Sequence, residues 1–299
     1  MTGVQTCALP ISDGVEWLQT GAWRLLRIGQ AVAWLGGREP ALGDWQGAQR
    51  IVRWILDQTL GGAVAAIGAR RFRVAYDACR GAGSVIIPAL LERLGCEVTA
   101  INLEPDGRFP RPPEPVPENL GDLERLVRET GAVVGFATDP DVDRLALVAD
   151  GGVAIGEDYP LALACRVVLP RRKGHAVANL STSQVVDDAV RASGQRLVHA
   201  PVGEVNVALR MRDTGAVIGG EGNGGVILPE LHLGRDAPLA VALTLQLLVD
   251  DARPLSRIVE ASPRYVIIKD KLPRGTAAMD AAYGALQAAF PDASASTED

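Results

Sequence analysis

Three aspartates in alternate positions, set between two apolar and β-branched runs, constrain the local fold of this chain more than any other feature. Asp139, Asp141 and Asp143 lie within residues 138–144 (TDPDVDR), between residues 133–137 (VVGFA) and 145–149 (LALVA). Apolar runs of this length with a short polar break are typical of two strands joined by a tight loop. Alternate residues of an extended chain share one side, so the three carboxylates can converge when the loop tightens.

Three converging carboxylates repel one another unless a cation or protons offset their charge. Carboxylate oxygens are hard ligands, so Mg²⁺ is the first candidate, with Ca²⁺ and Mn²⁺ behind it. Arg144 follows at once, and a guanidinium beside a carboxylate-held metal suits a phosphate that bridges both. The residues therefore predict a metal site with a phosphate near Arg144.

Two other readings of the same loop stay open. An EF-hand also begins D-x-D-x-D, but it needs Gly at its sixth position, Glu at its twelfth and helices on either side. Here those positions hold Arg144 and Asp150, and the flanks are strand-like. A solvated acidic turn that binds no ion is the remaining alternative, because short Asp-rich turns are common.

Composition limits the class of protein. The chain has 299 residues with 47% hydrophobic and 22% charged, which is typical of a globular protein with room for two domains. A net charge of −6 gives no reason to expect nucleic acid or an anionic membrane as a partner. No apolar run approaches the ~20 residues of a spanning helix. Four scattered cysteines without a C-x-x-C pair favour a reducing cytoplasm over a zinc or disulfide framework.

The order of strand and helix patterns is that of α/β layers. In the first set a strand at 73–77, a glycine loop at 78–84, a helix at about 85–94 and a strand at 97–102 are followed by a helix at 120–129 and the Asp hairpin. In the second set an apolar helix ending at 168 precedes strands at 176–180, 196–199 and 216–218 and helices at 183–192, 204–212 and 237–249. A further helix is expected at 45–60, a strand at 265–271 and a helix at 279–290.

A second candidate site is the glycine-rich run at 219–225 (GGEGNGG). Its glycines let a ligand approach the backbone closely, while Glu221 and Asn223 offer an acceptor and an amide to neighbouring hydroxyls. A flexible glycine hairpin without a ligand is the alternative. A dinucleotide site at Gly81 and Gly83 is the least favoured reading, because Ile86 stands where the third glycine of G-x-G-x-x-G belongs.

Residues 138–144 resemble the metal loop of the α-D-phosphohexomutases, the phosphoglucomutase, phosphomannomutase and phosphoglucosamine mutase family. Residues 77–84, 104–120 and 221–224 resemble further motifs of that family in the same order. The resemblance implies an α/β fold with two consecutive three-layer α/β/α domains and mixed sheets, plus remnants of a first and a last domain. The implied limits are a first-domain remnant at 13–44, the second domain at 45–165, the third at 166–262 and the start of the fourth at 263–299. Residues 1–12 show no helix or strand periodicity and lack the basic region of a signal peptide, so we expect them to be an artefactual leader.

The resemblance also implies an activity and its residues. The family is an intramolecular phosphotransferase that moves phosphate between C1 and C6 of a hexose or hexosamine phosphate through a phosphoserine and a bisphosphate. Mg²⁺ would be held by the three aspartates, and the substrate by Arg144, Gly203, Glu221 and Asn223. Gly225 departs from family members that carry His there, and His232 does not replace it by position.

The phosphoserine itself has no match. Ser12 lacks the His-Asn that should follow it, and the phosphate loop of the family's last domain is not found after residue 265. We therefore expect an inactive fragment, with a non-catalytic sugar-phosphate-binding protein as the alternative. The residues do not distinguish among glucose, mannose and glucosamine phosphates, and they leave the oligomeric state open.

Overall fold

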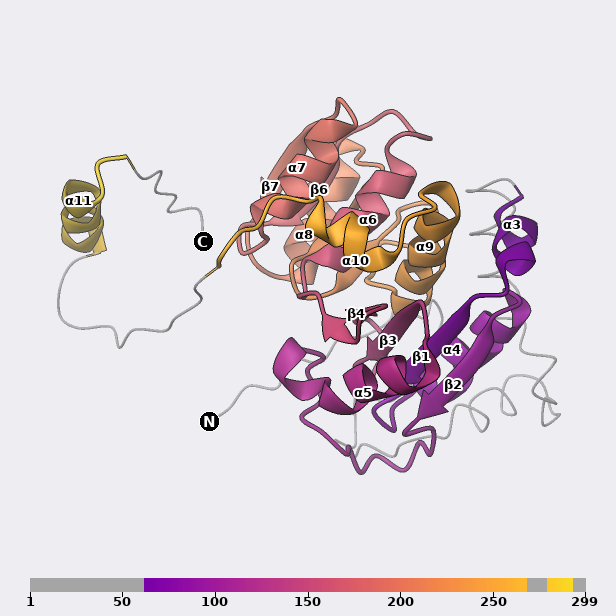
Figure 1. Cartoon of the computed structure of the whole chain (residues 1–299). Helices are drawn as coiled ribbons and strands as arrows, with labels where there is room; N and C mark the ends of the chain where they lie inside the picture. Colours follow the sequence, from indigo (N-terminus) through magenta and orange to yellow (C-terminus); the bar gives the residue numbers. More distant parts are fainter. Residues whose placement is uncertain (1–61, 268–278, 293–299) are drawn as a thin grey trace, which may run out of the picture.

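The computed structural model describes residues 62–267 and 279–292. Two sheets form its body, one of five strands in the order β2-β1-β3-β4-β5 and one of four in the order β7-β6-β8-β9 (Figure 1). The predicted leader, the first-domain remnant, the helix at 45–60 and Ser12 all lie outside the described residues. No described helix is long and apolar enough to cross a membrane.

The first sheet is mixed, and its hairpin carries the aspartate loop. Its elements are α3 (Ala63–Arg70), β1 (Arg73–Asp77), α4 (Gly83–Arg93), β2 (Glu97–Ile101), α5 (Gly121–Thr130), β3 (Val134–Thr138), β4 (Leu145–Ala149) and β5 (Val153–Ala154), with a short 3₁₀ turn at Pro117–Asn119. β1 runs parallel to β2 and β3, whereas β3 and β4 are antiparallel and pair Thr138 with Leu145. Alternate strand residues face opposite layers: Ala75 packs toward α5, and Tyr76 toward α4.

The second sheet repeats this plan. Its elements are α6 (Tyr159–Val168), β6 (Ala176–Asn179), α7 (Gln184–Ala192), β7 (Leu197–Ala200), α8 (Glu204–Thr214), β8 (Ile218–Glu221), β9 (Gly225–Ile227), α9 (Ala237–Asp250) and α10 (Leu255–Glu260). β6 runs parallel to β7 and β8, and β8 and β9 form an antiparallel hairpin. α8 covers one face through Val207 and Met211, while α6, α7 and α9 belong to the core on the other face. The predicted α/β fold with two mixed sheets between helix layers is confirmed.

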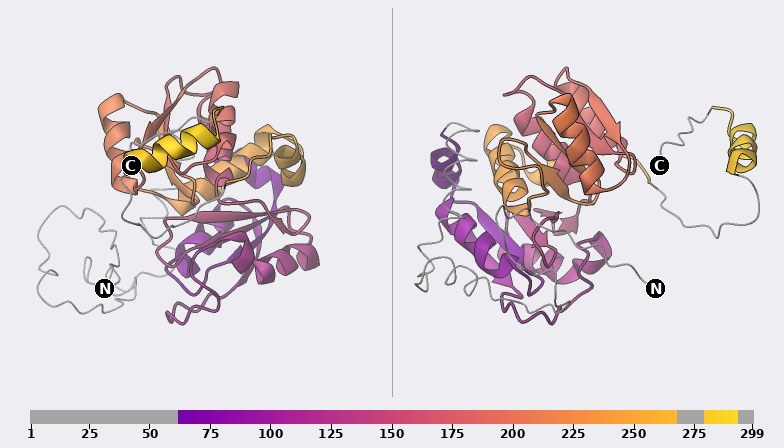
Figure 2. Two further views of the ribbon diagram at one scale, coloured as in Figure 1. Left: turned by 90° about the vertical axis from the view of Figure 1, so that its left-hand side faces the viewer. Right: turned by 180° about the vertical axis from the view of Figure 1, so that it is seen from behind.

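Helix α9 joins the two halves. Every residue from Ala237 to Leu248 is buried, as expected for a helix that is apolar all round. It contacts α6 and β9 of the second half and α3, α4 and β4 of the first (Figures 1 and 2). Asp236 caps it, because its side chain accepts a hydrogen bond from the Leu239 N–H at 2.7 Å. The cap agrees with the position of Asp236 directly before an apolar run of the sequence, and one hydrophobic core continues through both halves.

The glycine-rich run is less of a loop than its composition suggests. β8 begins at Ile218 and includes Gly219 and Gly220, so only three residues separate it from β9. A Cβ on Gly219 would lie 2.5 Å from the Met211 sulfur, and one on Gly220 would clash with the Gly225 carbonyl. Glycine in a strand often marks such a close approach. The predicted strand at 216–218 was therefore too short at its C-terminal end.

The C-terminal prediction was partly wrong. Residues 265–267 form no strand, and residues 268–271 lie outside the described part. Val266 is 89% exposed, and residues 265–267 belong to neither of the two described sheets. The predicted helix is present as α11 (Met279–Ala289), which lies apart from the body in Figure 1 and in the right-hand view of Figure 2. Helix α10 was not predicted.

Candidate functional site: two hairpins that meet

The β3–β4 loop is closed largely by its own first aspartate. Asp139 is fully buried, and its Oδ1 accepts hydrogen bonds from the backbone N–H groups of Asp143 at 3.2 Å and Arg144 at 3.1 Å. Its Oδ2 accepts from Arg144 Nε at 2.6 Å. Val142 is held at φ +66°, a left-handed conformation that costs a β-branched residue energy. The hydrogen bonds of Asp139 thus close the loop tightly, and the backbone at Val142 is strained as a result.

The predicted convergence of the three carboxylates is present. One oxygen each from Asp139, Asp141 and Asp143 lies within 4.8 Å of the others. Asp143 Oδ1 is buried and has no hydrogen-bond partner among the described residues, with Arg144 Nε 3.7 Å away. Burial is the largest influence on all three carboxyl groups and raises the pKa of each. Asp143 raises the pKa of Asp139 further, and Asp139 raises that of Asp141, whereas Arg235 opposes the rise at Asp143. A partly buried set of carboxylate oxygens with one oxygen left over fits a hard divalent cation such as Mg²⁺.

The glycine loop before α4 packs against the aspartate loop. A Cβ on Gly81 would lie 2.5 Å from Pro140 Cα, and the Ala82 N–H donates to the Pro140 carbonyl at 2.8 Å. A Cβ on Gly83 would clash with the Tyr76 hydroxyl, which is hydrogen-bonded to Thr138 Oγ1 at 2.9 Å. Glycine at these two positions therefore allows the close approach of the loop at Pro140 and of the Tyr76 and Thr138 side chains.

Arg111, from the proline-rich crossing, is a supporting residue that sequence reasoning missed. Its Nε bonds the buried Asp77 carboxylate at 2.7 Å, and its Nη2 donates to the Thr138 carbonyl at 3.0 Å. Thr138 directly precedes the first aspartate of the loop. No sequence signal marked Arg111, because its partners lie 34 and 27 positions away.

The β8–β9 hairpin meets the β3–β4 hairpin edge to edge. Arg144 and Gly225 form an isolated antiparallel bridge, and the Leu145 N–H donates to the Gly224 carbonyl at 3.1 Å. Gly224 has φ +94°, and a Cβ there would clash with the Leu145 backbone. The two candidate sites of the sequence, residues 138–144 and 219–225, therefore lie side by side in the structure.

Glu221 sits at the centre of the second hairpin and is 3% exposed. Its Oε1 accepts from Asn179 Nδ2 at 2.8 Å and from the Gly203 N–H at 3.2 Å. Its Oε2 accepts from Arg235 Nη1 at 2.8 Å and from Asn223 Nδ2 at 3.3 Å. The structure thus brings together Gly203, Glu221 and Asn223, three of the residues predicted to bind substrate. All four hydrogen bonds to Glu221 come from the protein itself.

Arg235 is the most consequential residue that sequence reasoning passed over. The sequence pattern assigns it no role, yet it forms ion pairs with Asp143 of the first hairpin and with Glu221 of the second. Its Nε lies 3.5 Å from Glu204 Oε2 at the start of α8. A Cβ on Gly225 would clash with the Arg235 stem, so Arg235 fills the space beside the glycine that departs from the family pattern.

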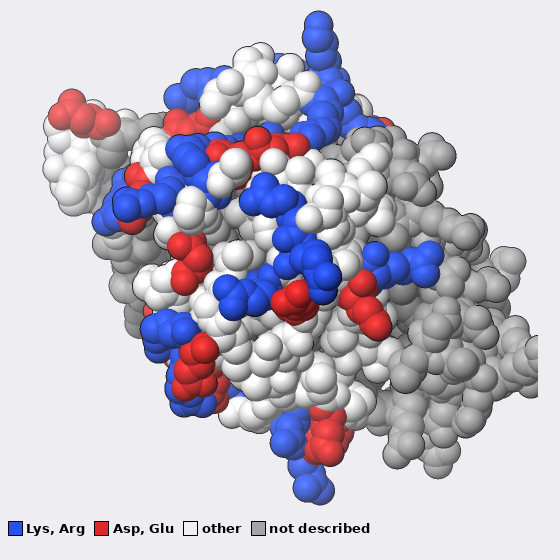
Figure 3. Space-filling view, turned by 45° about the vertical axis from the view of Figure 1, so that its right-hand side comes forward, with Lys and Arg blue, Asp and Glu red and all other residues white. Residues whose placement is uncertain are grey.

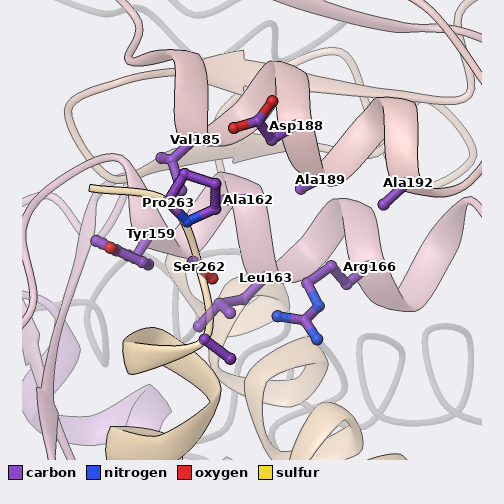
Figure 4. A pocket seen from close by; sticks show the side chains of 11 residues that line it. Tyr159, Ala162, Leu163, Arg166, Val185, Asp188, Ala189, Ala192, Ser262 and Pro263 are labelled. Carbon is purple, nitrogen blue, oxygen red and sulfur yellow. The ribbon is translucent and has the colours of Figure 1, made fainter. Parts of the chain in front are cut away.

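Outside this site the described surface carries two features of note. On the face in Figure 3, basic and acidic side chains are interspersed rather than gathered by sign. A cavity of about 230 Å³ lies between α6, α7 and the segment after α10, lined by Tyr159, Arg166, Asp188 and apolar neighbours (Figure 4). None of the predicted site residues lines it.

His232 is 42% exposed and bonds the Asp236 carboxylate at 2.9 Å.

Comparisons with known proteins agree with this architecture. Residues 57–152 match the family model of phosphoglucomutase/phosphomannomutase, alpha/beta/alpha domain II, and residues 157–265 match domain III of the same family. A probable phosphoglucosamine mutase of Methanopyrus kandleri is 42% identical over 200 residues, covering 66% of this chain and 44% of that protein. A phosphoglucomutase/phosphomannomutase of Thermococcus kodakarensis is 37% identical over 210 residues, covering 70% and 46%.

A solved structure shares the fold. The phosphoglucomutase/phosphomannomutase family protein of Burkholderia thailandensis superposes with a TM-score of 0.60 at 29% identity, covering 69% of this chain and 47% of that one. This chain spans less than half the length of the two curated relatives named above. Its matched part holds both α/β/α units and the two hairpins that meet between them. The chain belongs to the α-D-phosphohexomutase family, of which it contains domains II and III.

Proposed function

We propose that this chain carries the metal-binding and sugar-binding loops of a phosphohexomutase-type isomerase that acts on a hexose or hexosamine phosphate. The observation that supports this most is the meeting of the two hairpins, which places the three-aspartate loop beside Glu221 and Asn223. A sugar phosphate needs both kinds of group, since its phosphate is anionic and its ring carries hydroxyls.

Scattered cysteines, three of them free in the described part, favour the cytoplasm.

The metal of this site would be Mg²⁺, held by Asp139, Asp141 and Asp143. When bound, it would supply positive charge that stabilises a phosphoryl group in transfer. The residues do the rest. Asp139 keeps the loop closed, and Asp143 presents an oxygen that accepts no hydrogen bond from the described residues.

Arg144 would bind the phosphate, and the second hairpin the sugar. Arg144 is bonded to Asp139 through Nε, and a guanidinium has further N–H donors to offer. Glu221 would accept from a sugar hydroxyl in place of Asn223, whose bond at 3.3 Å is the longest of its four. Asn223, released from Glu221, and the backbone at Gly203 would complete the contact. These assignments rest on the placement of the residues around one another.

Binding is tested by calorimetry with MgCl₂ in the presence of glucose 1-phosphate. The unmodified protein should release or absorb heat that Asp141→Asn reduces strongly, because one of the three ligands is lost. Asp122→Asn is the matched control, since Asp122 is 68% exposed on α5 and far from the loop in sequence. Equal heats for Asp141→Asn and the unmodified protein would contradict a metal site here.

We further propose that these 299 residues bind sugar phosphate without isomerising it. The family's phosphoserine has no match here. Loss of a positioned nucleophile removes a contribution that can reach ~7–11 kcal/mol of barrier. A non-catalytic sugar-phosphate-binding role is therefore the second candidate, favoured because both hairpins are complete within the described residues.

A coupled assay separates the two candidates. Glucose, mannose and glucosamine 1-phosphates are each supplied with Mg²⁺ and a catalytic amount of sugar bisphosphate. We expect no turnover. A rate above ~1 s⁻¹, the low end for ordinary enzymes, that disappears in Ser12→Ala would show that Ser12 is the nucleophile and that the leader was misread.

A further inference from the structure

The side chain of Arg235 connects the two hairpins by binding one carboxylate in each of them. One Nη bonds Asp143 Oδ2 in the β3–β4 loop, and the other bonds Glu221 Oε2 at 2.8 Å in the β8–β9 hairpin. The ion pair with Asp143 joins residues 92 positions apart. Arg235 is 14% exposed at its side chain, and Glu221 and Asp143 are 4% and 16% exposed. The bridge is therefore largely shielded from solvent, where ion pairs are screened least.

Arg235 also determines which oxygen of Asp143 is left for a ligand. It occupies Oδ2, and Oδ1 is the buried oxygen without a hydrogen bond. A planar guanidinium can bond two carboxylates at once in fixed directions, which an ammonium cannot do. The Arg235 backbone is held as well, because its N–H donates to Glu204 Oε1 at 2.9 Å. Gly225 leaves room for the stem of Arg235 to pass.

We infer that Arg235 is a positioning residue that couples cation binding at Asp143 to the state of the sugar-side carboxylate Glu221. While Glu221 shares the guanidinium, the pull of Arg235 on Asp143 is partly offset. When Glu221 no longer offers a negative charge, Arg235 draws more strongly on Asp143 and competes with the cation for it. The inference rests on the proposed function, because it takes the three aspartates as the metal site.

The test is a double-mutant cycle on Mg²⁺ affinity, measured by calorimetry with MgCl₂ alone on the full chain. Glu221→Gln in the unmodified background should weaken Mg²⁺ binding about fivefold or more, the lower end of typical coupling between sites. In the Arg235→Lys background the same change should alter affinity less than about twofold, because lysine cannot bond both carboxylates in the fork geometry. The cycle thereby distinguishes an effect of Glu221 that is transmitted by Arg235 from a direct electrostatic attraction between Glu221 and the cation.

The matched control is Arg171→Lys. Arg171 forms an ion pair with Asp250, with an N–O distance of 2.7 Å, and neither residue belongs to the two hairpins. In this background Glu221→Gln should keep its full effect on Mg²⁺ affinity. Arg235→Met serves as a second background if Arg235→Lys melts too early, since both keep an unbranched stem beside Gly225. An equal Glu221→Gln effect with and without Arg235 would overturn the inference. Absence of Mg²⁺ uptake by the unmodified protein would instead overturn the proposed metal site, so the two failures are distinguishable.

Discussion

The two hairpins of the site are both antiparallel, but the buried carboxylate at the centre of each is held by different kinds of contact. In the β3–β4 loop the central Asp139 is bonded locally, since it accepts from the backbone of residues four and five positions later and from the Arg144 side chain. In the β8–β9 hairpin the central Glu221 depends on partners 42, 18 and 14 positions away, with Asn223 as its only near neighbour in sequence. Contacts between residues close in sequence can be predicted from the sequence, whereas contacts between distant residues cannot.

Removing the local support should have the largest effect. Asp139→Ala leaves two backbone N–H groups and Arg144 without their acceptor in a buried place, and breaking a buried pair from one side typically costs ~3–5 kcal/mol. We expect a loss near the lower end, about 3 kcal/mol, because Arg144 is 23% exposed. Urea unfolding in EDTA measures it. Asp122→Ala is the control, and a loss below about 1 kcal/mol would show that the loop is not held locally.

The junction of the hairpins is the next point at which to break the comparison. Gly224→Ala adds a Cβ that meets the Leu145 backbone at φ +94°, where L residues are strained. Overpacking of this kind costs ~1–3 kcal/mol, so we expect about 2 kcal/mol of lost stability. Gly151→Ala, with open space around its Cβ, should change stability little by comparison. If both variants unfold at the same urea concentration, the edge-to-edge contact does not restrain the hairpins.

The distant support can be weakened without touching the first hairpin. Asn179→Ala removes the donor to Glu221 Oε1 and the acceptor of the Ser181 and Thr182 hydroxyls. A lost hydrogen bond to a charged group is worth ~1.5–3 kcal/mol, and we expect the lower value because the Gly203 N–H still bonds the same oxygen. Mg²⁺ affinity should change much less than stability. A variant that loses Mg²⁺ binding but keeps its stability would contradict the division of labour between the hairpins.

The smallest expected effect is a pH dependence at the helix cap beside the site. The Asp236 hydrogen bond raises the pKa of His232 above its ordinary value, with added attraction from Glu204, against partial burial that lowers it. A raised folded-state pKa contributes stability that is full below the unfolded value and is lost as pH rises through the folded one. The melting temperature of the unmodified protein should therefore exceed that of His232→Gln more at pH 6 than at pH 8. An equal difference at both pH values would show that the contact is not charge-dependent.

Much of the framework followed from short-range patterns. The helix limits around α4, α5, α7 and α9 were predicted to within a few residues, because amphipathic or apolar periodicity and a glycine or cap at the end act locally. The strand at β8 was predicted too short, because the need for glycine at 219 and 220 comes from Met211 and Gly225 rather than from neighbours in sequence. The domain limits at 165 and 262, and the roles assigned to the site residues, stay predictions.

The sequence by itself predicted the three-aspartate hairpin, since two apolar runs around a short polar break indicate two strands, and alternate carboxylates can converge when the loop between the strands tightens. It also determined the cap of α9, which needs only Asp236 and the backbone that follows it. Tertiary structure alone decided that Arg235 would stand between Asp143 and Glu221, and that Arg111 would reach Thr138. The physical reason is range: an arginine finds its carboxylates through the packing of two sheets on α9, and contacts that form across a whole domain leave no period or spacing in the chain.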